Sequence, residues 1–138
     1  MNKVAIVFWS ATGNTETMAN CIAEGAKGTL LSCGEMTPAK LAEFDVVAFG
    51  CPAMGAEQLE GSEFEPMFAG LEGSLNGKKI ALFGSYGWGD GQWMRDWAER
   101  AQDDGAQLFS QEGLICNETP DEDVQAACRQ LGADLAAW

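Results

Sequence analysis

The sequence contains no histidine and few basic residues. Its 138 residues include 21 acidic side chains and only 8 lysines and arginines, which gives a net charge of −13 at pH 7. A chain of this charge repels nucleic acid and anionic lipid, so we exclude both as partners and expect basic proteins instead. Solubility alone would also explain this acidity. The lack of histidine argues against a zinc site.

The cysteines lack the spacing of a disulfide framework or of a metal motif. There are five of them, an odd number, and no two form a C-x-x-C pair. We therefore expect free thiols that pack as small hydrophobic side chains, which a reducing cytoplasm tolerates. No signal peptide precedes the first apolar segment, and no apolar run reaches the thickness of a bilayer. These features predict a cytoplasmic protein without membrane association.

The length and composition are those of one folded domain. With 46% hydrophobic and 21% charged residues, the chain can bury one sheet between helices but is too short for two cores. Short apolar runs alternate with helical segments throughout, without repeats or a linker. This alternation predicts an α/β fold in a single domain, residues 1–138, with a doubly wound parallel sheet.

Hydrophobic periodicity places the individual elements. Strands buried on both faces are expected at three nearly continuous apolar runs: residues 3–9, 45–51 and 78–85. A short second strand is expected at 30–33, and the fifth lies within 107–116, split at Glu112-Gly113. Helices are expected at residues 15–27, 38–44, 66–71, 92–104 and 121–137, with Gly28 ending the first.

Ligands bind in an open α/β sheet where the strands end, so the turns after the first, third and fourth strands form the candidate site. The first turn, Ser10-Ala11-Thr12-Gly13-Asn14-Thr15, has hydroxyl and amide groups at the start of a helix. Backbone N–H groups there suit an anion. Because the turn has no lysine or arginine and no G-x-x-x-x-G-K-[ST] motif, we expect a single phosphate. A simple hydroxyl-rich helix cap is the alternative.

The other two turns carry groups suited to a flat aromatic ligand. The third-strand turn, Cys51-Pro52-Ala53-Met54-Gly55-Ala56-Glu57, combines a thioether, a glycine peptide and a carboxylate. The fourth-strand turn, Ser85-Tyr86-Gly87-Trp88-Gly89-Asp90-Gly91, brackets Trp88 with glycines, so that its indole can project from the loop. A tryptophan that only caps the core is the alternative. Together the three turns predict a phosphorylated ligand with a flat ring.

These turns resemble those of flavodoxins. Residues 9–15 are similar to the flavodoxin phosphate loop, and residues 51–55 and 84–91 are similar to the two flavin loops of the short-chain clostridial type. The likeness covers essentially the whole chain, in the same order and spacing. It implies a flavodoxin-like five-stranded sheet of order 2-1-3-4-5 with helices on both faces. It also implies non-covalently bound flavin mononucleotide (FMN), no metal, and a monomeric one-electron carrier rather than an enzyme.

The resemblance implies how FMN is held. The phosphate would be bound by the loop amides and by Ser10, Thr12, Asn14 and Thr15, with help from Ser85. Asn117 matches a position near the ribityl chain. The implied cofactor-binding residues are Trp9, Ser10, Ala11, Thr12, Gly13, Asn14, Thr15, Pro52, Ala53, Met54, Gly55, Glu57, Ser85, Tyr86, Gly87, Trp88, Gly89, Asp90 and Asn117.

The resemblance also implies how the flavin ring is tuned. Trp88 would stack on the outer face, Met54 would cover the inner face, and Glu57 would accept a hydrogen bond from the flavin N3–H. The Gly55 carbonyl would turn toward N5 after uptake of one electron and one proton, which stabilises the neutral semiquinone. An anionic hydroquinone is disfavoured in so acidic a chain, so we expect a low-potential semiquinone/hydroquinone couple.

The chain departs from the family in the first and third-strand turns. Ala11 stands where flavodoxins usually have glycine, and Ala56 replaces a polar residue, which could alter phosphate binding and the redox potentials. Redox proteins such as ferredoxin- or flavodoxin-linked oxidoreductases are the expected partners. Four glutamates near the expected flavin edge would steer them, unless they belong to a merely solvated loop: Glu57, Glu60, Glu63 and Glu65.

Other readings of the same turns are weaker. An FMN-dependent NAD(P)H:quinone oxidoreductase is the enzymatic alternative, but such enzymes usually need insertions that this chain lacks. A receiver domain would need acidic residues in place of Trp9-Ser10 and an aspartate in place of Gly50-Cys51. A dinucleotide site would need a third glycine at Gln92. A phosphatase built on Cys51 would need an arginine in its loop.

Overall fold

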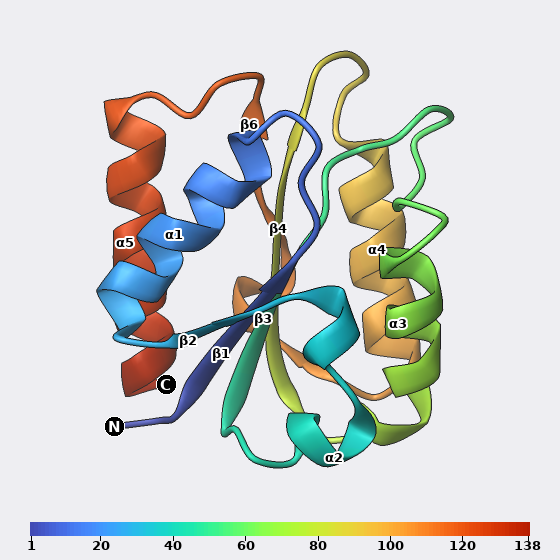
Figure 1. Cartoon of the computed structure of the whole chain (residues 1–138), viewed down its shortest axis with the longest axis vertical. Coiled ribbons are helices and arrows are strands. Elements are labelled where there is room, and N and C mark those ends of the chain that lie inside the picture. The colour runs from blue at the N-terminus through green and yellow to red at the C-terminus, as the bar shows by residue number, and fades with distance from the viewer.

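A computed structural model describes all 138 residues and contains one parallel sheet with helices on both faces (Figure 1). The sheet order is β2-β1-β3-β4-β5, and β6 also pairs with β4. The strands are β1 (Val4–Phe8), β2 (Thr29–Leu31), β3 (Val46–Gly50), β4 (Lys79–Tyr86), β5 (Gln107–Leu108) and β6 (Leu114–Asn117). The doubly wound sheet of order 2-1-3-4-5 is confirmed, with its fifth strand in two pieces.

The central strands are buried on both faces because nearly all of their side chains are apolar. Every residue of β3 is buried, as are the first four residues of β1. The long strand β4 pairs with β5 near its start, where Ile80 faces Leu108, and with β6 near its end, where Tyr86 faces Asn117. A 3-10 turn at Phe109–Gln111 separates β5 from β6. The predicted break in the fifth strand therefore exists.

Helices cover the two faces unequally. Helices α1 (Asn14–Ala26) and α5 (Glu122–Ala137) lie on one face, and α2 (Pro38–Leu41), α3 (Phe64–Leu71) and α4 (Gln92–Asp103) lie on the other (Figure 1). In α4 the predicted inward residues Trp93, Trp97 and Ala101 are buried. In α5 Cys128 and Leu135 are buried, while Val124 and Leu131 are partly buried against the core.

Helix α1 packs closely against α5 because two glycines let the backbones meet. A Cβ at Gly25 would lie 1.9 Å from the Arg129 carbonyl oxygen, and a Cβ at Gly132 would lie 2.1 Å from the Ile22 carbonyl oxygen. Real Cβ atoms do not approach this closely, so both positions require glycine. Helix α1 is therefore held firmly against α5, and this packing fixes the position of the first turn of α1.

Three local predictions were wrong in detail. Gly28 does not end α1; Lys27 takes the left-handed conformation there, at φ 51°. Gly28 is needed for another reason, because a Cβ would lie 2.7 Å from Ile6 Cδ1 and 2.8 Å from the Val4 carbonyl oxygen. Helix α3 begins at Phe64, ahead of the predicted residue 66. The second strand ends at Leu31, and Cys33–Glu35 forms a 3-10 turn.

The remaining global features are simple. None of the helices has the length and apolar character needed to span a bilayer. All five cysteines carry free thiols, and four of them are buried. Burial raises the pKa of the Cys51 and Cys128 thiols to about 12, which keeps them protonated and unreactive.

Candidate functional site

The turns that follow β1, β3 and β4 meet at the carboxyl edge of the sheet. They enclose an open cavity of about 390 Å³, within the size range of small-ligand sites. Its lining contains eleven of the predicted cofactor-binding residues: Ser10, Ala11, Thr12, Asn14, Thr15, Pro52, Ala53, Met54, Ser85, Tyr86 and Gly87. The sequence-derived site is thus assembled from three distant segments of the chain.

The first turn is shaped around Gly13, the residue before α1. Gly13 has φ 96°, a left-handed conformation that favours glycine. The Ser10 hydroxyl accepts hydrogen bonds from the backbone N–H groups of Gly13, at 3.1 Å, and Glu16, at 3.3 Å. Ala11 has no positive φ, so the departure from the family's glycine costs no backbone strain here.

Several backbone amides of this turn have no partner in the protein. The N–H groups of Ala11, Thr12, Asn14 and Thr15 make no hydrogen bond to any backbone or side-chain atom. They lie at the positive end of the α1 dipole and line the cavity. Unpartnered amides with nearby hydroxyls form a donor set that fits a phosphate group.

The hydroxyls of Thr15 and Ser85 join the first turn to the end of β4. Their Oγ atoms lie 2.9 Å apart, and the Ser85 backbone N–H also donates to Thr15 Oγ1 at 3.3 Å. Both residues are almost fully buried, at 1% and 5% exposed. Buried hydroxyls that bond one another hold two loops in a fixed relation.

The turn after β3 is a narrow hairpin with a free peptide at its tip. Met54 and Gln58 exchange two backbone hydrogen bonds, of 2.8 and 3.0 Å. Between them, Gly55 has φ 41° and Glu57 has φ 58°. No hydrogen bond of the chain involves the Gly55 carbonyl or the Ala56 N–H. This peptide can rotate without breaking a hydrogen bond of the protein.

Trp88 projects into solvent from the turn after β4. It is 71% exposed, whereas Trp93 and Trp97 are each 2% exposed. The alternative that Trp88 caps the core is therefore wrong. An exposed indole on a glycine-bracketed loop is available to a ligand or a partner.

Glu57 connects the turn after β3 with the start of α4. Its Oε2 accepts a hydrogen bond from the Trp93 backbone N–H at 2.7 Å. A Cβ at Gly89, which has φ 90°, would lie 1.9 Å from Glu57 Oε1. The fourth-strand turn thus passes directly over this carboxylate, and glycine at position 89 allows the close approach.

Other predicted site residues lie at the rim of the cavity or outside it. The Asp90 carboxylate pairs with Arg95 at 3.0 Å and faces solvent. Asn117 Nδ2 donates to the Tyr86 carbonyl oxygen at 3.4 Å. The predicted residues that do not line the cavity are Trp9, Gly13, Gly55, Glu57, Trp88, Gly89, Asp90 and Asn117.

Two cavity residues were not among the predicted ones. Glu118 and Thr119 follow β6 and line the cavity. Glu118 takes φ 61° and its N–H donates to the Tyr86 carbonyl oxygen at 2.7 Å. Because β6 is parallel to β4, its following residues reach the same edge. Extending the strand-end argument to the last strand would have found them.

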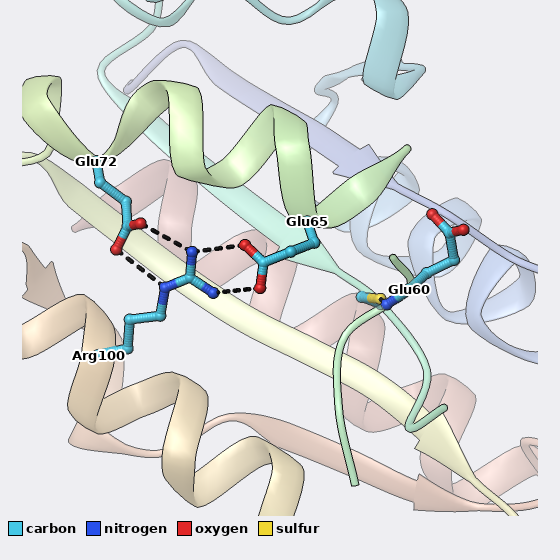
Figure 2. Close-up of polar contacts among 5 residues, drawn as sticks. Glu60, Glu65, Glu72 and Arg100 are labelled. Carbon is cyan, nitrogen blue, oxygen red and sulfur yellow. Dashed lines mark hydrogen bonds and ion pairs between the residues drawn. The ribbon is translucent and has the colours of Figure 1, made fainter. Parts of the chain in front are cut away.

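The predicted acidic docking cluster is wrong for Glu60, which is only 6% exposed. Burial raises the pKa of Glu60, but hydrogen bonds from the Ser62 hydroxyl and from the amides of Phe64, Ser62 and Glu63 outweigh it and lower the pKa to about 2. Glu65 is also engaged, because the Arg100 guanidinium lies between the carboxylates of Glu65 and Glu72, with contacts of 2.7 to 2.9 Å (Figure 2). The carboxylates of Glu60 and Glu65 therefore stabilise α3 and its packing, and they are not free to bind a docking partner.

Comparisons with known proteins agree with this geometry. The Flavodoxin family model matches residues 6–131. The chain is 46% identical over 138 aligned residues to a flavodoxin of Megasphaera elsdenii, across 96% of this chain and 98% of that protein. It is 43% identical over 136 residues to a flavodoxin of Clostridium beijerinckii, across 95% and 97%.

Structural similarity is equally extensive. The solution structure of two-electron reduced Megasphaera elsdenii flavodoxin matches with a TM-score of 0.88 and 44% identity, across 98% of this chain and 99% of that one. The three turns, their unpartnered amides and the exposed indole occur on a chain that is similar to these proteins from end to end. This chain belongs to the flavodoxin family, whose members bind FMN and carry electrons between other proteins.

Proposed function

We propose that residues 1–138 form one FMN-binding domain that works as a low-potential carrier of single electrons, with the cofactor in the cavity between the three turns. The observation that carries this proposal is the set of unpartnered amides beside that cavity. Bound FMN supplies a flavin ring that takes up and releases electrons. The protein's own residues hold that ring and set the free energy of each uptake.

The first turn would bind the phosphate. Its donors are the amides of Ala11, Thr12, Asn14 and Thr15 together with the hydroxyls of the turn. All of these donors are neutral, and no lysine or arginine lines the cavity. The helix dipole of α1 adds a favourable field.

The other two turns would hold the ring. Met54 lines the cavity and Trp88 projects from the neighbouring turn, so the two side chains can cover opposite faces of a flat ligand. Glu57 would offer an acceptor to a ring N–H through the oxygen that does not bind Trp93. The free Gly55 peptide can present its carbonyl to the ring without breaking a bond of the protein.

Electrostatics would set the low potential. The net charge of −13 and the absence of cations from the cavity make each added negative charge on the cofactor costly. The charge of the chain would therefore oppose a second added electron, while the free Gly55 carbonyl would accept a hydrogen bond from a protonated ring nitrogen. The two reduction steps should therefore separate.

Electron exchange needs a partner close to the exposed rim of the site. A groove of about 400 Å³ lies beside Glu57 and contains three acidic side chains: Glu57, Glu65 and Asp96. Since Glu65 is already paired with Arg100, Glu57 and Asp96 would attract a basic partner most directly. We propose that the monomer docks other redox proteins at this side.

A redox titration of the FMN-loaded protein, followed by absorption spectroscopy, tests the function. We expect two resolved one-electron steps, with the second at low potential. A single two-electron step would contradict the proposal. Rapid oxidation of NADPH by the purified protein alone would favour a quinone oxidoreductase instead.

A further inference from the structure

The indole of Trp9 is bonded to a residue far away in the sequence. Its Nε1–H donates to Glu63 Oε2 at 2.8 Å, across 54 positions of the chain. Trp9 immediately follows β1 and precedes the phosphate-loop residue Ser10. Glu63 is the residue before α3. The bond therefore joins the beginning of the phosphate loop to the start of a helix on the opposite face of the sheet from α1.

Glu63 is itself held in place by Glu60. The Glu63 backbone N–H donates to Glu60 Oε1 at 2.7 Å, and the Phe64 N–H donates to the same oxygen at 2.9 Å. The Glu60 backbone N–H donates to Cys51 Sγ at 3.3 Å. A continuous series of hydrogen bonds thus runs from the turn after β3 to the carboxylate that binds Trp9.

Trp9 is tied on its other side to β3. Its backbone N–H donates to the Gly50 carbonyl oxygen at 3.0 Å. With both its backbone and its ring fixed, Trp9 sets where the chain enters the phosphate loop. The next residue, Ser10, organises that loop through its bonds to Gly13 and Glu16.

We propose that Glu63 is a positioning residue for the phosphate loop, acting through the Trp9 indole on the amides and hydroxyls that receive the FMN phosphate. The inference rests on the phosphate site proposed above. Glu63 does not line the cavity, so it acts through Trp9 rather than on the ligand. Its carboxylate is useful as a hydrogen-bond acceptor, and its negative charge opposes binding of an anion.

Titration of the apoprotein with FMN and with riboflavin, which lacks the phosphate, tests this role. Glu63→Ala should weaken FMN binding by about threefold to tenfold, as expected for loss of one exposed hydrogen bond to a charged group, and should leave riboflavin binding unchanged. Glu63→Gln retains an acceptor oxygen and should stay within about twofold of the wild-type affinity. Glu99→Ala is the matched control, because Glu99 is an exposed helical glutamate without an ion pair or a side-chain hydrogen bond.

A double-mutant cycle separates this contact from general damage. Trp9→Phe keeps an aromatic ring but removes the N–H, and combining it with Glu63→Ala should cause no further loss of FMN affinity. The Trp9 indole proton should also exchange faster with solvent in Glu63→Ala, as measured by NMR. Equal weakening of FMN and riboflavin would overturn the proposal, and so would additive losses in the double variant.

Two further outcomes are informative. Tighter FMN binding in both Glu63 variants would overturn the proposal by assigning Glu63 a purely repulsive effect. If the wild-type protein itself did not prefer FMN to riboflavin, the phosphate site would be wrong. That result is distinguishable from a failure at Glu63, because it requires no variant.

Discussion

The carboxylate of Glu57 accepts a hydrogen bond from the Trp93 backbone N–H at 2.7 Å, which joins the tip of one cofactor-site turn to the first turn of α4. Glu57 adopts φ 58° to reach this position, and the adjacent turn passes over it at Gly89. A carboxylate at the positive end of a helix dipole stabilises that helix. The two turns that would hold the flavin ring are therefore linked by this hydrogen bond and by the close contact at Gly89.

Replacing Gly89 by alanine should disturb this coupling. The residue has φ 90°, and its new Cβ would lie 1.9 Å from Glu57 Oε1, so the carboxylate that bonds the Trp93 N–H must shift. We expect FMN affinity to fall about tenfold, because the free loop would relax away from this left-handed conformation and binding would have to restore a strain of about 1–2 kcal/mol. Gly87→Ala is the comparison, because nothing lies within 4 Å of its Cβ; its effect should be the smaller one. Equal affinities of the two variants in fluorescence titration would contradict this reading.

Glu60 should control the acid limb of the stability curve. Its pKa is about 2 in the folded protein, below the ordinary value, so its contribution is present above about pH 4.5 and is lost as the pH falls toward 2. Glu60→Gln should lose about 1–3 kcal/mol at pH 7, because charge-assisted bonds to the start of α3 are weakened. Urea unfolding from pH 2 to 7 should show a flatter acid limb for the variant. If the unfolding free energies of the wild type and Glu60→Gln changed equally with pH, Glu60 would not control the acid limb.

Asp104 should act in the opposite direction. Burial and the neighbouring Glu72 carboxylate raise its pKa to about 6, and its buried Oδ2 has no hydrogen-bond partner. Since the folded pKa is raised, the contribution of Asp104 is present below about pH 4 and is lost as the pH rises through 6. Asp104→Asn should therefore be more stable than the wild type at pH 7 and should converge with it near pH 4. A variant that is less stable at pH 7 would show that the carboxylate is needed.

Arg100 should be the basic residue that matters most for the packing of α3 against α4. It binds Glu65 and Glu72 together (Figure 2). Its guanidinium also lies over the Phe68 ring, 5.0 Å from the ring centroid. Arg100→Ala leaves two carboxylates without their cation and should cost about 2 kcal/mol, between the values of exposed and buried pairs. Arg95 is the control, because its pair with Asp90 has side chains 55% and 80% exposed. Urea unfolding should show a loss for Arg95→Ala below about 0.5 kcal/mol.

Local sequence patterns predicted those parts of the fold that depend on burial. The central strands and α4 are specified by apolar residues at the spacing of their own element, so their positions follow from the chain alone. The start of α3 was missed because Glu60 caps it with a side chain from an adjoining loop. The role of Gly28 was missed because its constraint comes from the backbone of β1. Contacts between distant segments leave little local signal.

In the candidate site, too, some features could be predicted from local sequence and others depend on contacts between distant segments. The residues of the three turns could be named because parallel strands end at one edge, which brings successive turns together. The partners of their side chains could not be named. The hydrogen bond from Trp9 to Glu63 and the burial of Glu60 depend on how α3 packs, and the sequence pattern of four nearby glutamates indicated only a charged surface.

Trp88 offers the sharpest test of the ring site, because its exposed side chain makes no hydrogen bond within the protein. Trp88→Ala should leave the stability of the apoprotein unchanged within about 0.5 kcal/mol. It should weaken FMN binding by about 2 kcal/mol, or about thirtyfold in Kd, through lost stacking and lost burial. Trp138→Ala should do the reverse, because Trp138 packs on Phe109 with ring centroids 5.3 Å apart and neither residue lines the cavity. The Trp138→Ala variant should have lower stability and unchanged FMN affinity. If Trp88→Ala bound FMN as tightly as the wild type, Trp88 would not belong to the ring site.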